Sequence, residues 1–176
     1  VHGISSKMVS RHRHVFGEEE AETSDDVMKI WEDVKKKEKG FMTHTQTLKD
    51  VPANLPALMR SYKVQQKAAR VGFDWDNVED AFRKIEEETL ELKEAYKKGD
   101  KGDIEEELGD LLFAVVNVSR FMEVQPELAL SATVNKFIRR FEYVEEKARE
   151  QGKSLEEMSL REMDDLWNLC KETENK

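Results

Sequence analysis

The amino-acid sequence predicts an all-α protein, and two observations support that prediction. Only eight glycines and three prolines stand among 176 residues. The charged 38% and the apolar 38% of the chain are rich in Glu, Lys, Leu and Ala, which favour helices. Apolar side chains also recur at every third or fourth position over long stretches, the period of a helix with one buried face. The length suits one domain with a sizeable core plus an extension.

Charge and cysteine content narrow the class of protein. A formal net charge of -9 argues against a nucleic-acid groove, which needs a basic face to displace phosphate counterions. The one cysteine, Cys170, excludes an internal disulfide and suits a reducing cytoplasm. No apolar run approaches the roughly 18 to 20 residues of a membrane span, and no signal peptide is recognisable. We therefore expect a cytoplasmic protein with neither nucleic acid nor membrane as a partner.

The first third of the chain predicts two helices separated by a linker. Ser24 is the expected N-cap of a helix whose apolar positions repeat at helical spacing: Val27, Ile30, Trp31 and Val34. Residues 35–48 lose this rhythm and contain Gly40, which indicates a linker. Pro56 suits the first position of a second helix that runs to about Val71.

Two longer helices are expected over residues 77–98 and 103–124. The turn at 99–102 between them is short, so the two helices should be antiparallel neighbours. The second is apolar nearly all round between Leu108 and Met122, a pattern typical of a central, buried helix.

Four carboxylates on these two helices form the candidate metal site. Glu88 and Glu91 on the first helix, and Glu107 and Asp110 on the second, are each three residues apart and so share a helix face. Two such pairs facing each other would surround a divalent cation with oxygens. Because Asp110 lies on an otherwise apolar helix, we expect it to be buried and to need a shared cation as its partner. Gly109 would let a ligand or a second backbone approach between Glu107 and Asp110.

Two more helices complete the chain. The first covers about residues 126–151, and its apolar positions repeat as a near-heptad seam that fits bundle or dimer packing: Leu130, Val134, Phe137, Phe141, Val144 and Ala148. Ser159 and Glu162 predict a capping box that starts the last helix. Beside the seam stand Lys136, Arg139 and Arg140. These are an ordinary solvated cluster by themselves, but opposite a bound cation they become candidate phosphate ligands, since Arg matches phosphate oxygens in bidentate geometry.

Four segments, in this order, resemble the MazG family of nucleoside triphosphate pyrophosphohydrolases: KIEEETLEL, IEEELGDLLFAVVNVSRF, NKFIRRF and DDLWNLCK. The likeness covers about residues 52–172 and includes the family's EExxE element at 87–91 and its ExxD element at 107–110. It implies a helical bundle of the all-α NTP pyrophosphatase type, assembled as a homodimer. It also implies hydrolysis of nucleoside triphosphates to monophosphate and pyrophosphate with Mg²⁺, for which Mn²⁺ is a possible substitute.

The same resemblance assigns expected roles by position. The implied metal ligands are Glu88, Glu91, Glu107 and Asp110. The implied nucleotide contacts are Lys84, Lys136, Arg139, Arg140, Trp167 and Lys171, with Asn117 and Lys63 as further candidates. Glu88 and Glu107 are expected to be catalytic through the metal, and Glu87 is the candidate for positioning or deprotonating the attacking water. Asp103 departs from the pattern, because some relatives have a lysine there, near the phosphates.

The N-terminal segment SSKMVSRHRHVFG resembles the end of the first of two tandem MazG domains, with Arg13 where a proline is usual. We therefore predict that residues 1–50 are a remnant of a preceding domain plus a linker helix. Residues 51–176 would then be the second domain, which the resemblance makes the catalytic one.

Three alternatives remain at this level. One is a narrow-specificity dUTP or dCTP pyrophosphatase, and another is a non-catalytic helical dimerisation module. The third, a carboxylate-bridged di-iron bundle, needs Glu-x-x-His pairs. All four histidines lie at or before His44, outside the predicted bundle, so the sequence disfavours the third alternative.

Overall fold

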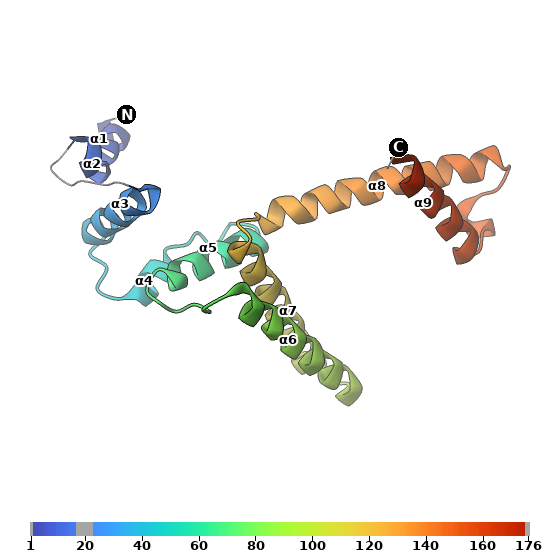
Figure 1. Cartoon of the computed structure of the whole chain (residues 1–176), viewed down its shortest axis with the longest axis horizontal. Helices are drawn as coiled ribbons and strands as arrows, with labels where there is room; N and C mark the ends of the chain where they lie inside the picture. Colours follow the sequence, from blue (N-terminus) through green and yellow to red (C-terminus); the bar gives the residue numbers. More distant parts are fainter. Residues whose placement is uncertain (1, 17–22, 175–176) are drawn as a thin grey trace. The chain divides into compact units, whose positions relative to one another are not determined.

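The computed structural model describes residues 2–16 and 23–174, and all regular structure within these ranges is helical (Figure 1). This confirms the all-α prediction. By its internal contacts the chain divides into two compact units, one made of residues 1–55 and 63–74 and the other of residues 56–62 and 75–176. The domain boundary between residues 50 and 51 stays a prediction. None of the described helices combines the length and apolar character needed to cross a bilayer.

The first unit contains the helices of the N-terminal third, which are α1 (His2–Arg11), α2 (Arg13–Phe16), α3 (Ser24–Glu38) and α4 (His44–Lys49). Helix α1 packs against α3, where the Ser10 hydroxyl donates to Glu38 Oε1 at 2.7 Å. Helix α5 (Ala57–Ala69) begins in the second unit and ends in the first.

The N-cap of α3 is Thr23, one residue before the predicted Ser24. The Thr23 hydroxyl accepts from the Asp26 amide at 3.2 Å, and the Asp26 carboxylate accepts from the Thr23 amide at 3.1 Å. The helix prefers Thr23 because this reciprocal pair forms a complete capping box.

The predicted linker over residues 35–48 is partly wrong. Helix α3 continues to Glu38, and α4 follows from His44 to Lys49. A capping box of Thr43 and Gln46 starts α4, so this short helix depends on local hydrogen bonds and shows no apolar period. Its end is tied back to α3, because Asp50 pairs with Lys35 at 2.8 Å and also with Lys39.

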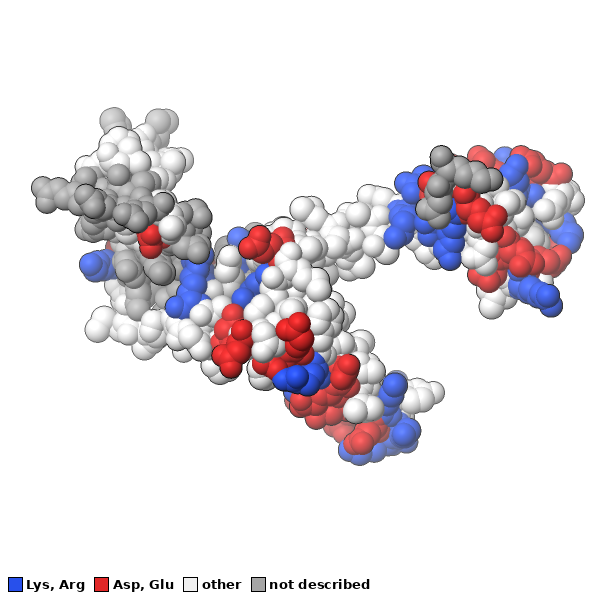
Figure 2. All heavy atoms as spheres, in the orientation of Figure 1, with Lys and Arg blue, Asp and Glu red and all other residues white. Residues whose placement is uncertain are grey.

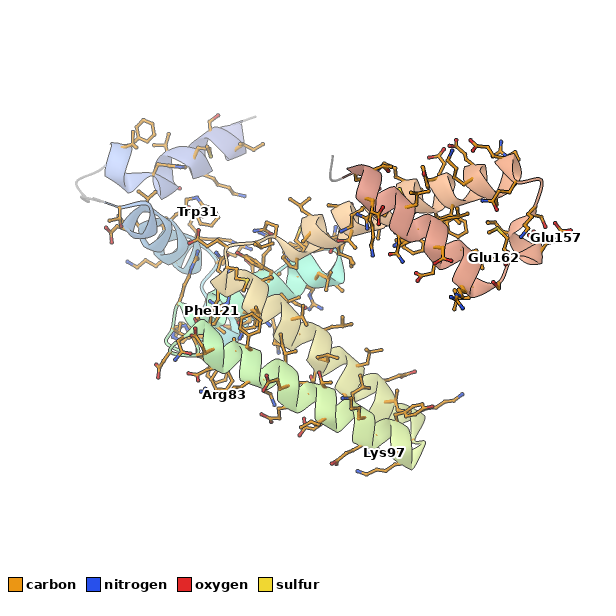
Figure 3. The ribbon with its side chains drawn as sticks, turned by 45° about the vertical axis from the view of Figure 1, so that its right-hand side comes forward. Trp31, Arg83, Lys97, Phe121, Glu157 and Glu162 are labelled. Atoms are coloured by element: carbon orange, nitrogen blue, oxygen red, sulfur yellow. The ribbon has the colours of Figure 1, made fainter. Side chains whose placement is uncertain are left out.

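In the second unit, α6 (Val78–Lys98) and α7 (Lys101–Phe121) form an antiparallel hairpin, as predicted (Figures 1 and 3). The Asn77 side chain caps α6 by accepting from the Asp80 amide at 2.9 Å. Gly99 ends α6 with φ 79°, a left-handed conformation that favours glycine. Asp100 then caps α7 by accepting from the Gly102 amide at 2.8 Å, so α7 begins two residues before the predicted start.

The prediction that this second helix is central and buried is wrong for the described chain. Small residues are buried on both helices: Ala81 and Ala95 on α6, and Ala114, Val116 and Val118 on α7. Four large apolar side chains of α7 are 43–49% exposed: Leu108, Leu112, Phe113 and Val115. The physical reason is that the described chain covers the surface of α7 only in part, so the rest of its apolar surface needs further partners.

Helices α8 (Pro126–Glu150) and α9 (Leu160–Glu174), with the short 3₁₀ helix η1 (Leu155–Glu157) in the turn between them, form a second hairpin (Figure 1). The predicted capping box is confirmed, because the Ser159 hydroxyl accepts from the Glu162 amide at 3.3 Å and Glu162 accepts from the Ser159 amide at 2.8 Å. Figure 3 shows Glu157 and Glu162 at this turn.

The near-heptad seam of α8 has two parts. Val144 and Ala148 are 2% and 1% exposed and lie in the half of the helix along which α9 returns (Figure 1). The earlier members of the seam are 44–56% exposed: Leu130, Val134, Phe137 and Phe141. The chain by itself therefore buries only the second half of the seam.

Candidate metal and phosphate-binding site

Glu88 is the buried acid of the α6–α7 hairpin. It is 4% exposed, and its Oε1 lies 2.5 Å from Lys84 Nζ. Its Oε2 is buried, and no donor among the described residues reaches it. A buried carboxylate oxygen without a partner costs free energy, so this atom marks a position where a ligand would be stabilising.

The structure brings all four predicted metal ligands into two overlapping groups that share Glu88. In the first, Glu88, Glu107 and Asp110 each offer one oxygen, and these oxygens lie within 4.8 Å of one another. In the second, Glu88 and Glu91 are joined by Glu87 with the same spacing. Glu88 therefore lies at the centre of an acidic cluster that joins α6 and α7.

The expectation that Asp110 is the buried carboxylate is wrong. Asp110 is exposed and Glu107 is half-buried, because the described chain covers this part of α7 only in part. Glu88 is the carboxylate that is buried and needs a partner. It lies at the border of the apolar face of α6 and becomes buried because α7 packs on that face.

The cluster holds like charges close together. Partial burial, followed by the negative charges of Glu88 and Asp110, raises the pKa of the Glu107 carboxyl above its ordinary value. Loss of solvent and the charges of Glu88 and Glu107 likewise raise the pKa of Glu91. Lys84 partly offsets this repulsion, and its own pKa is raised by hydrogen bonds to Glu87 and Glu88.

The donor set fits a hard divalent cation. Both groups consist of carboxylates, and carboxylate oxygens are the ligands that Mg²⁺, Mn²⁺ and Ca²⁺ prefer. A di-iron centre of the Glu-x-x-His type would need histidines beside these acids, and the sequence has none after His44.

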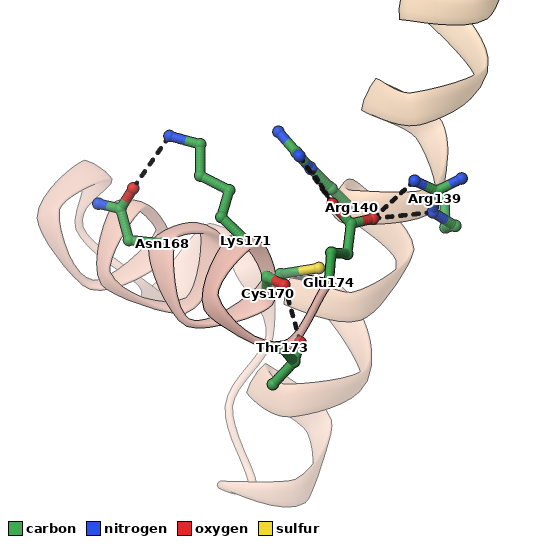
Figure 4. Close-up of polar contacts among 7 residues, drawn as sticks. All are labelled: Arg139, Arg140, Asn168, Cys170, Lys171, Thr173 and Glu174. Carbon is green, nitrogen blue, oxygen red and sulfur yellow. Dashed lines mark hydrogen bonds and ion pairs between the residues drawn. The ribbon is translucent and has the colours of Figure 1, made fainter. Parts of the chain in front are cut away.

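Cationic and aromatic side chains gather on the other hairpin. Arg139 and Arg140 of α8 both contact Glu174 of α9 (Figure 4). The Arg140 guanidinium also lies 5.8 Å from the centre of the Trp167 ring, and Phe137 packs against Trp167 with ring centroids 5.1 Å apart. Of the predicted nucleotide ligands, Arg139, Arg140 and Trp167 are thus brought together.

The remaining predicted nucleotide ligands are more dispersed. Lys171 donates to Asn168 at 3.2 Å, and Lys136 is exposed on α8. The Asn117 oxygen accepts two hydrogen bonds from Arg120, at 3.1 and 2.8 Å. Lys63 is exposed on α5, in the part of that helix that belongs to the first unit.

Sequence reasoning missed Glu174. It lies 34 and 35 residues from the two arginines that it contacts, and only the return of α9 along α8 brings them together. The acidic residue gives no periodic signal in the sequence, so nothing short of the tertiary structure could have found this contact.

An all-α chain with a carboxylate cluster between two helices belongs to the class of helical proteins that can bind a divalent cation. Comparison with known families makes the class more specific, because residues 77–145 match the model of the MazG nucleotide pyrophosphohydrolase domain. The match covers both acidic pairs and the two arginines of α8. Residues 77–145 of this chain are therefore a MazG domain.

Similar proteins extend this likeness along the chain. This chain is 40% identical over 168 residues to the nucleoside triphosphate pyrophosphohydrolase/pyrophosphatase MazG of Thermotoga maritima. The alignment covers 96% of this chain and 63% of that protein. The chain is 38% identical over 175 residues to the nucleoside triphosphate pyrophosphohydrolase of Escherichia coli K12, covering 97% and 66%. The Bacillus subtilis protein YabN, described as uncharacterized, is 48% identical over 177 residues, which is 100% of this chain and 36% of that protein. The chain therefore spans less than two thirds of each of these relatives.

Proposed function

We propose that this chain hydrolyses nucleoside triphosphates to nucleoside monophosphates and pyrophosphate, with Mg²⁺ as the cofactor and Mn²⁺ as a possible substitute. The observation that supports this most directly is Glu88, a buried carboxylate with an unpartnered oxygen at the centre of the acidic cluster of a MazG domain. A triphosphate carries about four negative charges. The acidic cluster would repel it unless a cation bound between the carboxylates and the phosphates.

In this proposal Glu88, Glu91, Glu107 and Asp110 hold the metal. A bound Mg²⁺ would supply Lewis-acid polarisation of the α-phosphate and charge stabilisation of the leaving pyrophosphate. Glu87, which now accepts from Lys84 Nζ at 2.7 Å, would orient or deprotonate the attacking water. Lys84, which now contacts Glu87 and Glu88, would contact the nucleotide.

Residues of the α8–α9 hairpin would bind the rest of the substrate. Arg139 and Arg140, with Lys136 on the same helix, would contact the outer phosphates, since guanidinium groups bind phosphate oxygens in bidentate geometry. Trp167 and Lys171 of α9 would contact the nucleotide. Asn117 and Lys63 are further candidates. The Asn117 side-chain oxygen already accepts a hydrogen bond from Arg120.

We further propose that the active protein is a homodimer in the cytoplasm. The first half of α8 has no charged residue from 128 to 135, which Figure 2 shows as an uncharged surface. Its large apolar side chains are exposed in the single chain, and a contiguous apolar face of this kind marks an association surface. The cytoplasmic assignment is supported by Cys170, a single buried thiol that needs no oxidising compartment.

Product analysis tests the reaction. The chain is incubated with Mg²⁺ and either ATP or dCTP, and the products are separated. We expect monophosphate and pyrophosphate in equal amounts. Orthophosphate together with a nucleoside diphosphate would contradict the proposed bond cleavage, and a panel of ribo- and deoxynucleotides would measure substrate preference.

Thermal unfolding with and without Mg²⁺ tests the metal site independently of enzyme turnover. Mg²⁺ at about 100 times its Kd should stabilise the wild-type fold by about 2.7 kcal/mol. Glu88→Gln, Glu107→Gln and Asp110→Asn should each weaken or remove this Mg²⁺-dependent shift in the melting temperature and abolish turnover, while helix content by circular dichroism stays near wild type. Glu94→Gln, an exposed position on α6, is the matched control. If Mg²⁺ stabilises the Glu88→Gln variant as much as wild type, Glu88 is not a metal ligand.

A further inference from the structure

We propose that Glu174 competes with substrate phosphates for Arg139 and Arg140. Its carboxylate binds both guanidinium groups and has to leave before a polyphosphate can bind them. The inference rests on the proposed function, in which these two arginines bind the outer phosphates. It adds a residue outside the matched domain to the control of nucleotide affinity.

The geometry of the contact is that of an anion held by two guanidiniums. Glu174 Oε1 accepts from Arg139 Nε at 3.0 Å and Nη2 at 2.6 Å. Its Oε2 accepts from Arg140 Nε at 2.8 Å and lies 2.7 Å from Arg140 Nη2 (Figure 4). Each carboxylate oxygen thus meets one guanidinium edge, the same donor arrangement that binds phosphate oxygens.

Arg139 is open to solvent and solutes, whereas Arg140 is mostly covered. The Arg139 side chain is 63% exposed, and that of Glu174 is 24% exposed. The Arg140 side chain is 17% exposed and is positioned by the Trp167 ring as well as by Glu174. An anion arriving from solution can therefore reach Arg139 directly and displace the carboxylate stepwise.

The attachment of α9 to α8 does not depend on Glu174. Trp167 of α9 packs on Phe137 of α8, and Cys170 of α9 is buried; the capping box of Ser159 and Glu162 separately stabilises the first turn of α9. Glu174 stands in its last turn, where a negative charge opposes the helix dipole. Its stabilisation comes from the two arginines, whose hydrogen bonds lower the pKa of its carboxyl, so release leaves the rest of the hairpin intact.

Competition of this kind lowers affinity by a calculable factor. If the Glu174 contact forms in about nine tenths of the molecules, only about one tenth is competent to bind phosphate, and the apparent Kd rises about tenfold. A polyphosphate carries more negative charge than one carboxylate and can outcompete it.

The test compares Glu174→Gln and Glu174→Ala with wild type, and uses Glu172→Gln, an exposed acid on the same helix, as the control. With ATP and Mg²⁺ we expect the KM of both Glu174 variants to fall about three- to tenfold with kcat nearly unchanged. By calorimetry, the Kd for inorganic tripolyphosphate with Mg²⁺ should fall by a similar factor. The Glu172→Gln variant should match wild type in both measurements.

The outcomes separate the two proposals. If wild type produces pyrophosphate but folded Glu174 variants keep the wild-type KM and tripolyphosphate Kd, the competitor is disproved and the function stands. If both variants melt at lower temperature without tighter binding, Glu174 is only a structural contact and the inference is again overturned. If wild type produces no pyrophosphate from any nucleotide, the proposed function fails, and tighter tripolyphosphate binding by the variants would still support the competing carboxylate.

Discussion

Partial burial of Glu107, together with repulsion by the charges of Glu88 and Asp110, makes the stability of the metal-free protein depend on pH. The pKa of Glu107 is raised in the folded protein, so the folded state binds its proton more tightly than the unfolded chain, in which the value is ordinary. The contribution of this group to stability is therefore greatest below its ordinary pKa of 4.5 and falls as pH rises through the folded pKa.

Glu107→Gln should remove this dependence at one position. Because Gln has no charge to repel its neighbours, we expect the metal-free variant to melt at a higher temperature than wild type at neutral pH and to lose less stability between pH 4.5 and neutrality. Thermal unfolding in the presence of a chelator measures both. Glu105→Gln, exposed on the same helix, should keep the wild-type slope, and an unchanged slope for Glu107→Gln would show that the repulsion is relieved by other means.

At the scale of single residues, the sequence predicts which acids can converge, because their spacing is matched. It does not predict which of them is buried, because burial depends on tertiary packing. The i,i+3 pairs on two adjacent helices were enough to predict that the four carboxylates converge, since the turn at Gly99 leaves α6 and α7 antiparallel. Which of them is buried depends on which face α7 covers, and that is decided by the small residues Ala81 and Ala114. The Arg139–Glu174 contact depends on long-range packing and has no local signal.

Two glycines of the α6–α7 hairpin should respond oppositely to replacement by alanine. Gly99 has φ 79°, so Gly99→Ala should destabilise the protein by about 1 kcal/mol, through the strain of an L residue in the left-handed region. Gly109 lies within α7, and an added Cβ would meet nothing within 4 Å. Gly109→Ala should therefore stabilise the metal-free protein by about 0.8 kcal/mol through higher helix propensity.

Urea unfolding of the metal-free variants measures both changes. A destabilised Gly109→Ala variant would indicate a close approach at this position that the described chain does not contain. If Gly109→Ala is more stable but loses the Mg²⁺-dependent rise in melting temperature, its role is to leave space for the ligand, as the sequence suggested.

At the scale of elements, periodicity found the long helices that bury an apolar face and missed short ones such as α4. Helix α4 has no buried residue and was predicted as linker, because its stability comes from the capping box of Thr43 and Gln46. The composition of α7 predicted a buried helix, but burial needs partners, and the described chain leaves large side chains such as Leu112 about half exposed.

For the whole molecule, the exposed apolar face of α8 predicts assembly. Leu130 and Val134 are 52% and 48% exposed, and no charged residue interrupts residues 128–135. Replacing exposed side chains usually changes the stability of a single chain by less than about 0.5 kcal/mol. Two lysines placed in a dimer interface would instead be desolvated and would repel their copies across the symmetry axis.

The double variant Leu130→Lys with Val134→Lys should therefore separate assembly from folding. We expect wild type to sediment at twice the chain mass of 20.5 kDa and the variant at the chain mass, with helix content retained. Glu145→Lys, exposed on the same helix, changes the net charge by the same two units and should leave the dimer intact. A wild-type protein at the chain mass would refute the dimer, and a double variant that still sediments as a dimer would place the interface elsewhere, with the exposed face of α7 as the next surface to test.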